Sequence, residues 1–332
     1  MIEILPDRIR QLLDTLNGMT ILIIGDVMLD KYVWGHVRRM SPEAPVPVVE
    51  VERDAFHLGG AANVASNVQA LGAVPLLVGV VGSDDAATRE LTELMESKGL
   101  QTTGLIEDSG RRTTVKTRII AHQQHVVRAD REDRFPVEKE LASRLCEFVQ
   151  GVLGDMDAVI LQDYNKGVLS SEVLERLLPI LRDSGVPVTV DPKFERFFDF
   201  KGVTLFKPNL SEVERALGTS LVDDGSVIEA AELIRQRLDV ANVLITRGAQ
   251  GMTLLEEDGT ATHVGARARK VFDVSGAGDT VIATITSMLA AGSSMQEAAA
   301  IAGFAAGVVV GEVGAVPIHA ETLLTAVDEE YE

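Results

Sequence analysis

The segment with the clearest chemical potential is residues 274–280, VSGAGDT, which precedes a small-residue apolar stretch over 281–291 that predicts a buried helix. Gly276 and Gly278 let the backbone turn sharply and approach a ligand closely. The N–H groups at this turn would point out of the helix N-terminus and form an anion site. Asp279, kept ionised by the helix dipole, could take a proton from an attacking hydroxyl beside a phosphoryl group. The alternative is that this aspartate only caps the helix.

A glycine pair opens a second predicted helix near the N-terminus, over residues 61–71. Gly59 and Gly60 permit close backbone approach to a ligand. Asn63 can both donate and accept hydrogen bonds toward a polyol. Packing of the helix against a sheet would explain the same residues without any ligand.

Asp26 and Asp30 follow the first predicted strand, residues 20–24. Ligands of open α/β sheets lie at the carboxyl ends of parallel strands. A carboxylate at that place suits bidentate binding of sugar hydroxyls. The alternative is an acidic loop in water.

Residues 207–212, KPNLSE, begin another predicted helix. Ser211 could cap it, with Glu214 completing a capping box. Asn209 and Glu212 could instead face a nucleotide phosphate and a hydrated Mg²⁺.

Residues 246–251, TRGAQG, join two β-rich runs. Their glycines could wrap a nucleotide, or the segment could be a plain hairpin. The phosphate-binding pattern GxxxxGK[ST] is absent, GxGxxG does not follow the first strand, and the protein-kinase motifs HRD and DFG are missing.

Short apolar runs alternate with helical patterns along the chain, which predicts an α/β fold with a mostly parallel sheet covered on both faces. The predicted strands are 20–24, 76–81, 158–161, 186–190 and 243–246. The predicted helices include 61–71, 86–98, 138–152, 171–184 and 228–238. Residues 44–51 and 113–128 break the alternation and predict a small second sheet, inserted as a lid.

The amino-acid composition excludes several classes of function. With 50 acidic and 31 basic side chains the net charge is −19, which repels nucleic acids and anionic membranes. Cys146 is the only cysteine, so disulfides and cysteine-based metal sites are excluded. The start lacks the pattern of a signal peptide, and the longest apolar run, 298–310, is too short to span a bilayer. We therefore expect a cytoplasmic protein.

Two motifs together carry a family resemblance. GGAANVA and DVSGAGDT, in this order and with PNLSE and TRGAQG between them, resemble the signatures of the ribokinase-type (pfkB) carbohydrate kinases. The segments GDVMLDKYVWG, MSPEAPVPVVEV, DYNKG, VDPK and AAGVVVGEVG are most similar to the D-glycero-β-D-manno-heptose-7-phosphate kinases within that family. The similarity covers residues ~18–318, nearly the whole chain.

The resemblance implies an ATP-dependent sugar kinase with a three-layer α/β/α sandwich and a small β lid, in one domain over residues 1–332. The lid strands would come from about 33–58 and 112–130, and the enzyme would form a homodimer through the lid. No nucleotidyl-transferase domain is expected, so the chain would act as a kinase alone.

The resemblance also implies roles for residues. Asp279 would be the general base, with an anion hole formed by Gly276, Ala277 and Gly278. The sugar would contact Asp30, Gly59, Gly60 and Asn63. Asn209 would contact the ATP phosphates, and Glu212 would bind Mg²⁺ through water. Three residues would line the nucleotide site: Thr246, Gly248 and Gly251. Asp273 would bind a monovalent cation, expected to be K⁺.

A sugar that already carries a phosphate needs basic partners despite the net charge of −19. Lys166 and Lys193 follow apparent strand ends and are expected near the site. The full set of candidate cations is Arg38, Arg39, Lys116, Arg118, Arg128, Lys166 and Lys193.

Other functions stay open from the sequence. The phenylalanine-rich loop over 194–202 departs from the heptose-kinase pattern and could signal another sugar or nucleoside substrate. Gly303 stands where relatives often carry an asparagine that contacts adenine. A catalytically silent sugar or nucleotide sensor is a further alternative, although a sensor has no need of Asp279, and a nicotinamide dehydrogenase is a distant one.

Overall fold

The main body of the molecule is built around a nine-stranded sheet. The computed structural model describes residues 4–122, 124–268, 271–312 and 314–331. The sheet has the order β13-β12-β11-β10-β9-β8-β1-β4-β5, and its strands are parallel except for the antiparallel pairs β11–β12 and β12–β13. Their bounds are β1 Thr20–Gly25, β4 Val74–Gly82, β5 Leu105–Asp108, β8 Ala158–Gln162, β9 Val188–Asp191, β10 Leu205–Phe206, β11 Asn242–Thr246, β12 Met252–Leu255 and β13 Ala261–Val264.

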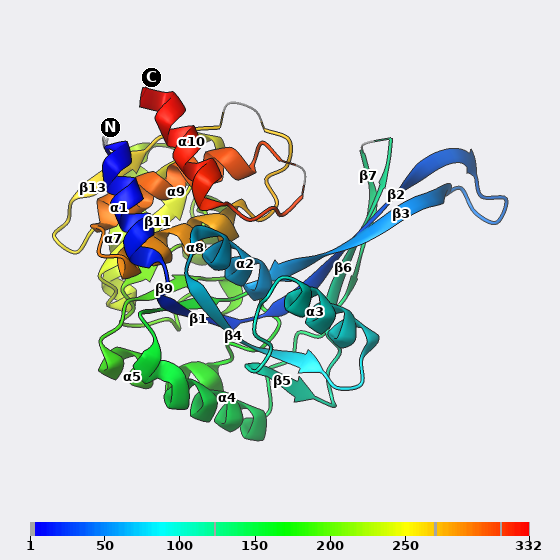
Figure 1. The fold of residues 1–332 in the computed structure, drawn as a ribbon, viewed down its shortest axis with the longest axis horizontal. Helices are drawn as coiled ribbons and strands as arrows, with labels where there is room; N and C mark the ends of the chain where they lie inside the picture. Colours follow the sequence, from blue (N-terminus) through cyan, green and yellow to red (C-terminus); the bar gives the residue numbers. More distant parts are fainter. Residues whose placement is uncertain (1–3, 123, 269–270, 313, 332) are drawn as a thin grey trace.

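Alternate residues of β1 divide the core into two clusters. Ile21 and Ile23 face one hydrophobic cluster, and Leu22 and Ile24 face the other. The period of two follows from the pleat of a strand that is buried on both faces. The sheet therefore forms the middle of three layers, as expected (Figure 1).

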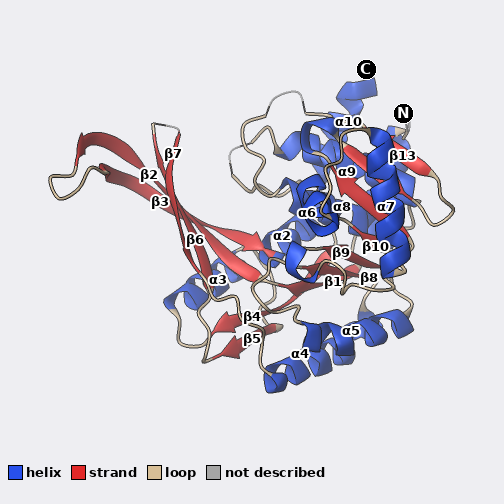
Figure 2. Cartoon of the chain, turned by 180° about the vertical axis from the view of Figure 1, so that it is seen from behind, coloured by secondary structure: helices blue, strands red, loops and turns tan. Residues whose placement is uncertain are grey.

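Helices cover both faces of the sheet (Figures 1 and 2). The first cluster is formed with α1 Pro6–Leu16, α2 Ala61–Leu71, α3 Ala86–Ser97, α8 Ala277–Ala290, α9 Met295–Val309 and α10 Ala320–Tyr331. The second is formed with α4 Lys139–Val152, α5 Ser171–Ser184, α6 Leu210–Leu217 and α7 Asp224–Leu238.

Two helices begin earlier than predicted. Helix α7 starts at Asp224 because the Asp223 side chain caps it and Ser226 completes a capping box. Helix α8 starts at Ala277, directly after Gly276 in the left-handed region, so Asp279 lies within its first turn.

A four-stranded sheet projects from the body as a lid (Figures 1 and 2). Its order is β3-β2-β6-β7, with β2 Val27–Met40, β3 Pro47–Gly60, β6 Thr114–Ala121 and β7 Gln124–Arg131. The interpretation of Asp26 and Asp30 as loop acids in water is wrong. Asp26 is buried beside the start of β2, and Asp30 is buried within that strand, paired with His57 of β3.

Within the described part of the chain, no helix combines the length and the apolar character needed to cross a membrane.

Candidate active site

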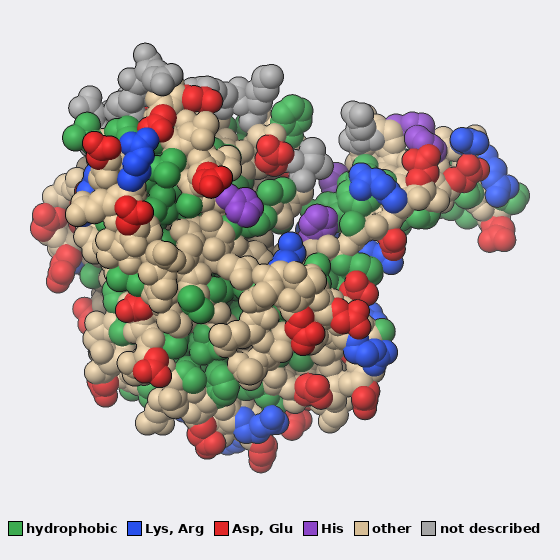
Figure 3. Space-filling model, viewed as in Figure 1, with side chains coloured by type: hydrophobic (Ala, Val, Ile, Leu, Met, Phe, Trp, Pro, Cys, Tyr) green, Lys and Arg blue, Asp and Glu red, His purple; other side chains and the backbone are tan. Residues whose placement is uncertain are grey.

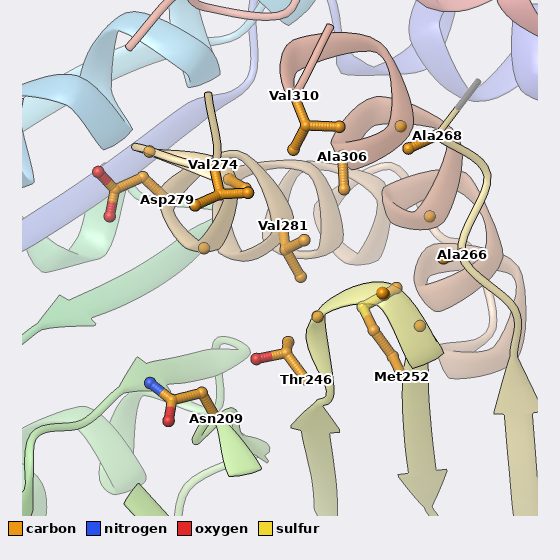
Figure 4. Close-up of a pocket in the computed structure, with 18 of the residues that line it drawn as sticks. Asn209, Thr246, Met252, Ala266, Ala268, Val274, Asp279, Val281, Ala306 and Val310 are labelled. Atoms are coloured by element: carbon orange, nitrogen blue, oxygen red, sulfur yellow. The ribbon is translucent and has the colours of Figure 1, made fainter. Parts of the chain in front are cut away.

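A cavity of about 430 Å³ lies between the N-terminus of α8 and the carboxyl ends of the central strands. Asp279 projects from α8 on one side, and Asn209 and Thr246 lie across from it (Figure 4). Much of the remaining lining is apolar and includes Val274, Val281, Met252, Ala306 and Val310. A phosphorylated ligand with a flat apolar ring fits such a lining.

Three neutral side chains hold the carboxylate of Asp279. Its Oδ1 accepts hydrogen bonds from Tyr164 Oη at 2.7 Å and Gln162 Nε2 at 3.1 Å. Its Oδ2 accepts one from Asn63 Nδ2 at 2.8 Å. Since each carboxylate oxygen has about two lone pairs, Oδ1 is saturated and Oδ2 keeps one for a further donor.

Burial raises the pKa of Asp279 to about 6, and the nearby Asp191 carboxylate adds to the rise. Hydrogen bonds from Asn63 and Tyr164, and the Lys193 charge, oppose it. Burial is thus the largest cause of the raised pKa of Asp279, and the contribution of the helix dipole to its ionisation stays a prediction. The carboxylate is still charged at neutral pH and is a stronger base than an exposed aspartate.

One buried lysine, Lys207, and one half-buried lysine, Lys193, bring positive charge to the cavity. Lys207 Nζ lies 3.2 Å from the Asp191 carboxylate, and both side chains are buried. Lys193 Nζ lies 2.7 Å from Glu212 Oε1. Although burial alone would lower it, Asp191 and Glu212 raise the pKa of Lys193. Lys193 therefore keeps its charge in a protein whose net charge is −19.

The turn before α8 has the shape of an anion cradle. Gly276 has a φ of +79°, which only glycine adopts without strain. A Cβ built on Gly278 would lie 3.7 Å from Lys207 Nζ, so this lysine faces the first helical turn. The backbone N–H groups of residues 276–278 have no partner within the helix, and that of Ala277 donates to the Val274 carbonyl at 3.3 Å.

The lid contributes a second group of polar side chains. Arg118 Nη1 of β6 lies 2.5 Å from Asp30 Oδ1 of β2. Lys116 Nζ lies 5.2 Å from the centre of the Tyr164 ring, and Lys193 Nζ lies 5.1 Å from it. Burial lowers the pKa of Lys116. The structure thus brings Lys116, which makes no ion pair among the described residues, close to the ring that touches Asp279.

Gly59 and Gly60 are buried at the end of β3. A Cβ on Gly59 would lie 2.7 Å from Asp30 Oδ2, and one on Gly60 would lie close to the Asp26 carbonyl. Close packing against Asp26 and β2, rather than packing of the helix against the sheet, therefore requires both glycines, and their contact with sugar stays a prediction.

The remaining candidate cations lie elsewhere. Lys166 is buried against Glu132, with 2.8 Å between Nζ and Oε2, and does not line the cavity. Arg38, Arg39 and Arg128 are exposed on the lid. Figure 3 shows lysine and arginine side chains gathered at the outer end of the lid, away from the body.

Asn209 and Glu212 form the capping box of α6 with each other, so the alternative box of Ser211 and Glu214 is wrong. Asn209 Oδ1 accepts from the Glu212 N–H, and Glu212 Oε2 accepts from the Asn209 N–H, both at 2.9 Å. The Asn209 side chain still borders the cavity (Figure 4). Capping and ligand binding are thus compatible at this helix start.

The segment from Thr246 to Gly251 is both a hairpin and part of the cavity wall. It joins the antiparallel strands β11 and β12, and Gly248 and Gly251 have positive φ angles of 56° and 80°. Thr246, Gly248 and Gly251 all line the cavity. Gly303 of α9 lines it as well, and a Cβ there would lie 3.0 Å from Val264.

The phenylalanine-rich loop has a structural explanation. Phe197 and Phe200 are buried in the second core cluster, and Phe197 packs edge-on against Phe206. Phe194 and Phe198 lie under the guanidinium groups of Arg215 and Arg237. None of these phenylalanines lines the cavity, and core packing and contact with arginines explain their presence in the loop.

Asp273 ties two loops together. Its carboxylate accepts the N–H of Ser275 at 2.9 Å and that of Gly314 at 3.1 Å. The structure describes no grouping of three or more His, Cys, Asp or Glu side chains suited to a metal ion, within residues 4–122, 124–268, 271–312 and 314–331. A cation at Asp273 would need backbone oxygens as further ligands and stays a prediction.

Four site residues were not singled out from the sequence: Gln162, Tyr164, Asp191 and Lys207. All four stand at or just after the carboxyl ends of the neighbouring strands β8, β9 and β10. The rule that ligands bind at this edge of a parallel sheet could have identified them.

The fold and the site define an α/β phosphotransferase that acts on a sugar hydroxyl. A model described as pfkB family carbohydrate kinase matches residues 20–322. The chain belongs to this family.

The similar curated proteins extend beyond the matched region. The bifunctional protein HldE of Caulobacter sp. is 45% identical over 321 residues, and that of Paramagnetospirillum magneticum is 42% identical over 317 residues. Each match covers 96% of this chain and 65% of the relative, so the chain spans about two thirds of the relatives' length.

Solved structures share the fold. Phosphofructokinase-2 from Escherichia coli, in its tetrameric inhibited form, superposes with a TM-score of 0.78 at 17% identity, covering 95% of this chain and all of that chain. Arabidopsis thaliana ribokinase, complexed with ribose and ATP, gives a TM-score of 0.72 at 17% identity, and the match covers 93% of this chain and 99% of that chain. At these identities the likeness concerns the fold alone.

Proposed function

We propose that the protein transfers the γ-phosphoryl group of ATP to the anomeric O1 of D-glycero-β-D-manno-heptose 7-phosphate and so forms the 1,7-bisphosphate. The observation that carries the chemistry is Asp279, buried in the first turn of α8 with one free lone pair on Oδ2. The choice of sugar is supported by the similarity to HldE proteins and by the lid cations beside the site.

The reaction needs mainly positioning and charge neutralisation. Asp279 Oδ2 takes the proton of the O1 hydroxyl as the O1–P bond forms and the bond to the ADP oxygen breaks. Backbone N–H groups at residues 276–278 and the Lys207 ammonium stabilise the charge on the transferring group.

ATP would occupy the cavity with its base between the hairpin at Gly248 and the apolar face of α9. Mg²⁺ usually keeps several waters and binds through substrate phosphates. Glu212 Oε2 accepts the Asn209 N–H, and Oε1 accepts a hydrogen bond from Lys193 Nζ. Each oxygen therefore keeps one lone pair that could accept a hydrogen bond from a water on Mg²⁺. K⁺ at Asp273 would order the loop that precedes the anion cradle.

A homodimer through the lid is part of the proposal. All eight residues of β7, an edge strand of the lid, are exposed, and exposed edge strands readily pair with another chain.

The test of the proposed function is ADP release with Mg-ATP, in K⁺ and in Na⁺, against a panel of sugars. The panel contains the heptose 7-phosphate, fructose 6-phosphate, ribose, fructose and adenosine. A clear preference for the heptose phosphate is the expected result. Faster turnover of an unphosphorylated sugar would overturn the substrate assignment, and binding without ADP release for every sugar would favour a sensor.

Replacing Lys116 should weaken binding of the sugar phosphate. Lys116→Met removes the unpaired lid cation, so KM for heptose 7-phosphate should rise ~10–100-fold, the value of a hydrogen bond to a charged group. KM for ATP should stay near that of the wild type. The matched control is Lys31→Met, which removes a lid lysine that pairs with Asp54. Equal effects of the two variants would remove Lys116 from the sugar site.

The rate should depend on pH through Asp279. Because the base must be ionised and its pKa is about 6, kcat/KM should fall ~10-fold per unit below pH 6 and level off above about 7. The charged and titratable groups around it are Tyr164, Asp191, Lys193 and, beside Asp191, Lys207. An acid limb near pH 4, as for an exposed aspartate, would contradict a buried base with a raised pKa at this site.

A further inference from the structure

Asp26 is a buried carboxylate that has no part in the reaction above. It follows β1 directly, and only 1% of the residue is exposed. Its carboxylate accepts the backbone N–H of Tyr164 at 2.7 Å, of Lys166 at 3.0 Å and of Val168 at 3.2 Å. The backbone N–H groups of residues 164, 166 and 168 therefore all donate to this one carboxylate.

The backbone of Asp26 is tied to the same neighbourhood. Its N–H donates to the Gln162 carbonyl at 3.1 Å, and its carbonyl accepts the N–H of Ala61 at 3.0 Å. Ala61 is the first residue of α2, the helix that carries Asn63. All three donors to Asp279 therefore lie on segments that Asp26 anchors.

The loop after β8 has reason to need such an anchor. Asn165 and Gly167 have φ angles of +55° and +93°, so two of its residues lie in the left-handed region. A non-glycine residue in that region is held there by its surroundings. Since Tyr164 is part of the same loop, the position of its hydroxyl depends on the bonds to Asp26.

We propose that Asp26 is a positioning residue, whose carboxylate fixes the loop so that the Tyr164 hydroxyl holds Oδ1 of Asp279 and leaves Oδ2 facing the substrate. The proposal rests on the proposed function only in taking Asp279 as the base. Asp26 itself does not touch Asp279, and its effect passes through Tyr164.

A double-mutant cycle tests this route. Asp26→Asn keeps the volume but turns one acceptor into an amide donor that faces backbone N–H groups. We expect kcat to fall ~10²-fold, as for a misplaced catalytic group, with KM for ATP near that of the wild type. Tyr164→Phe should lower kcat by a comparable factor, and Asp26→Asn should add little to it. If Asp26→Asn lowers kcat by the same factor in the wild type and in Tyr164→Phe, the proposal is overturned.

Asp157→Asn is the matched control. The Asp157 carboxylate accepts the N–H of Thr20 at 2.7 Å, at the opposite end of β1 from the site. This variant should keep the wild-type kcat. If Asp26→Asn does not fold, Asp26→Ser keeps one acceptor oxygen in a smaller volume and enters the same cycle.

A spectroscopic measurement separates this proposal from the proposed function. The chain has three tyrosines, so 3-fluorotyrosine gives few ¹⁹F resonances, and Tyr164→Phe identifies that of Tyr164. We expect this resonance to shift with an inflection near pH 6 as Asp279 titrates. Asp279→Asn should abolish the inflection, which distinguishes it from titration of Asp163, whose pKa burial raises to about 7.

In Asp26→Asn the inflection should be lost, and in Asp157→Asn it should persist. An unchanged inflection in Asp26→Asn would overturn the positioning role even in an inactive enzyme. A normal wild-type inflection without heptose phosphorylation would count against the proposed substrate alone.

Discussion

Asp279→Asn should lower kcat by ~10²–10⁴, the contribution of a positioned general base. The amide keeps the size of the side chain and can still accept hydrogen bonds from Tyr164 and Gln162 through its oxygen. It has no basic oxygen for the substrate proton. Binding of ATP and of the sugar should therefore change much less than turnover, as single-turnover kinetics and calorimetry can show.

The fold should tolerate this change. Because burial raises the pKa of Asp279, replacing the charged group with a neutral one relieves a desolvation cost, and thermal stability should be equal or higher. Asp7→Asn, an exposed acid in the first turn of α1, controls for loss of a helix-start charge. Near-normal turnover in Asp279→Asn would remove Asp279 from the role of base.

Lys207→Met should have the second-largest effect, on both stability and rate. It removes the ion-pair partner of the buried Asp191 carboxylate, which typically costs about 3–5 kcal/mol of unfolding free energy. It also removes the charge that faces the anion cradle, so kcat should fall ~10²–10³-fold. Urea unfolding and steady-state kinetics measure the two effects separately.

The double variant Lys207→Met/Asp191→Asn separates structure from catalysis. With the uncompensated charge gone, stability should return most of the way to the wild type. Turnover should stay low, because the Lys207 ammonium that faces the first turn of α8 is still missing. Recovery of both quantities together would mean that Lys207 serves only to pair Asp191.

Local patterns in the sequence were sufficient for much of the fold. The continuous apolar run of β1 and the helical periodicity of α2 and α5 identify these elements because they depend on neighbouring residues alone. The predicted start of α7 was wrong because Asp223 caps the helix by accepting the Ser226 N–H, four residues before the apolar pattern begins. The short β10 has two residues, too few for any period to be seen.

The sequence by itself determined the family and the α/β layers, and it predicted Asp279 as the base, because apolar periods, glycine turns and a helix-start aspartate are local features of the chain. Only the tertiary structure decided which side chains meet that base. Asn63 lies on α2, whereas Gln162 and Tyr164 lie at and just after the end of β8. The folded sheet brings these two segments and the start of α8 together, so that all three side chains bond to Asp279. It also decided which lysines are paired, since Lys166 meets Glu132 while Lys116 reaches Tyr164. Burial and ion pairing depend on residues from many parts of the fold, so no local pattern in the sequence predicts them.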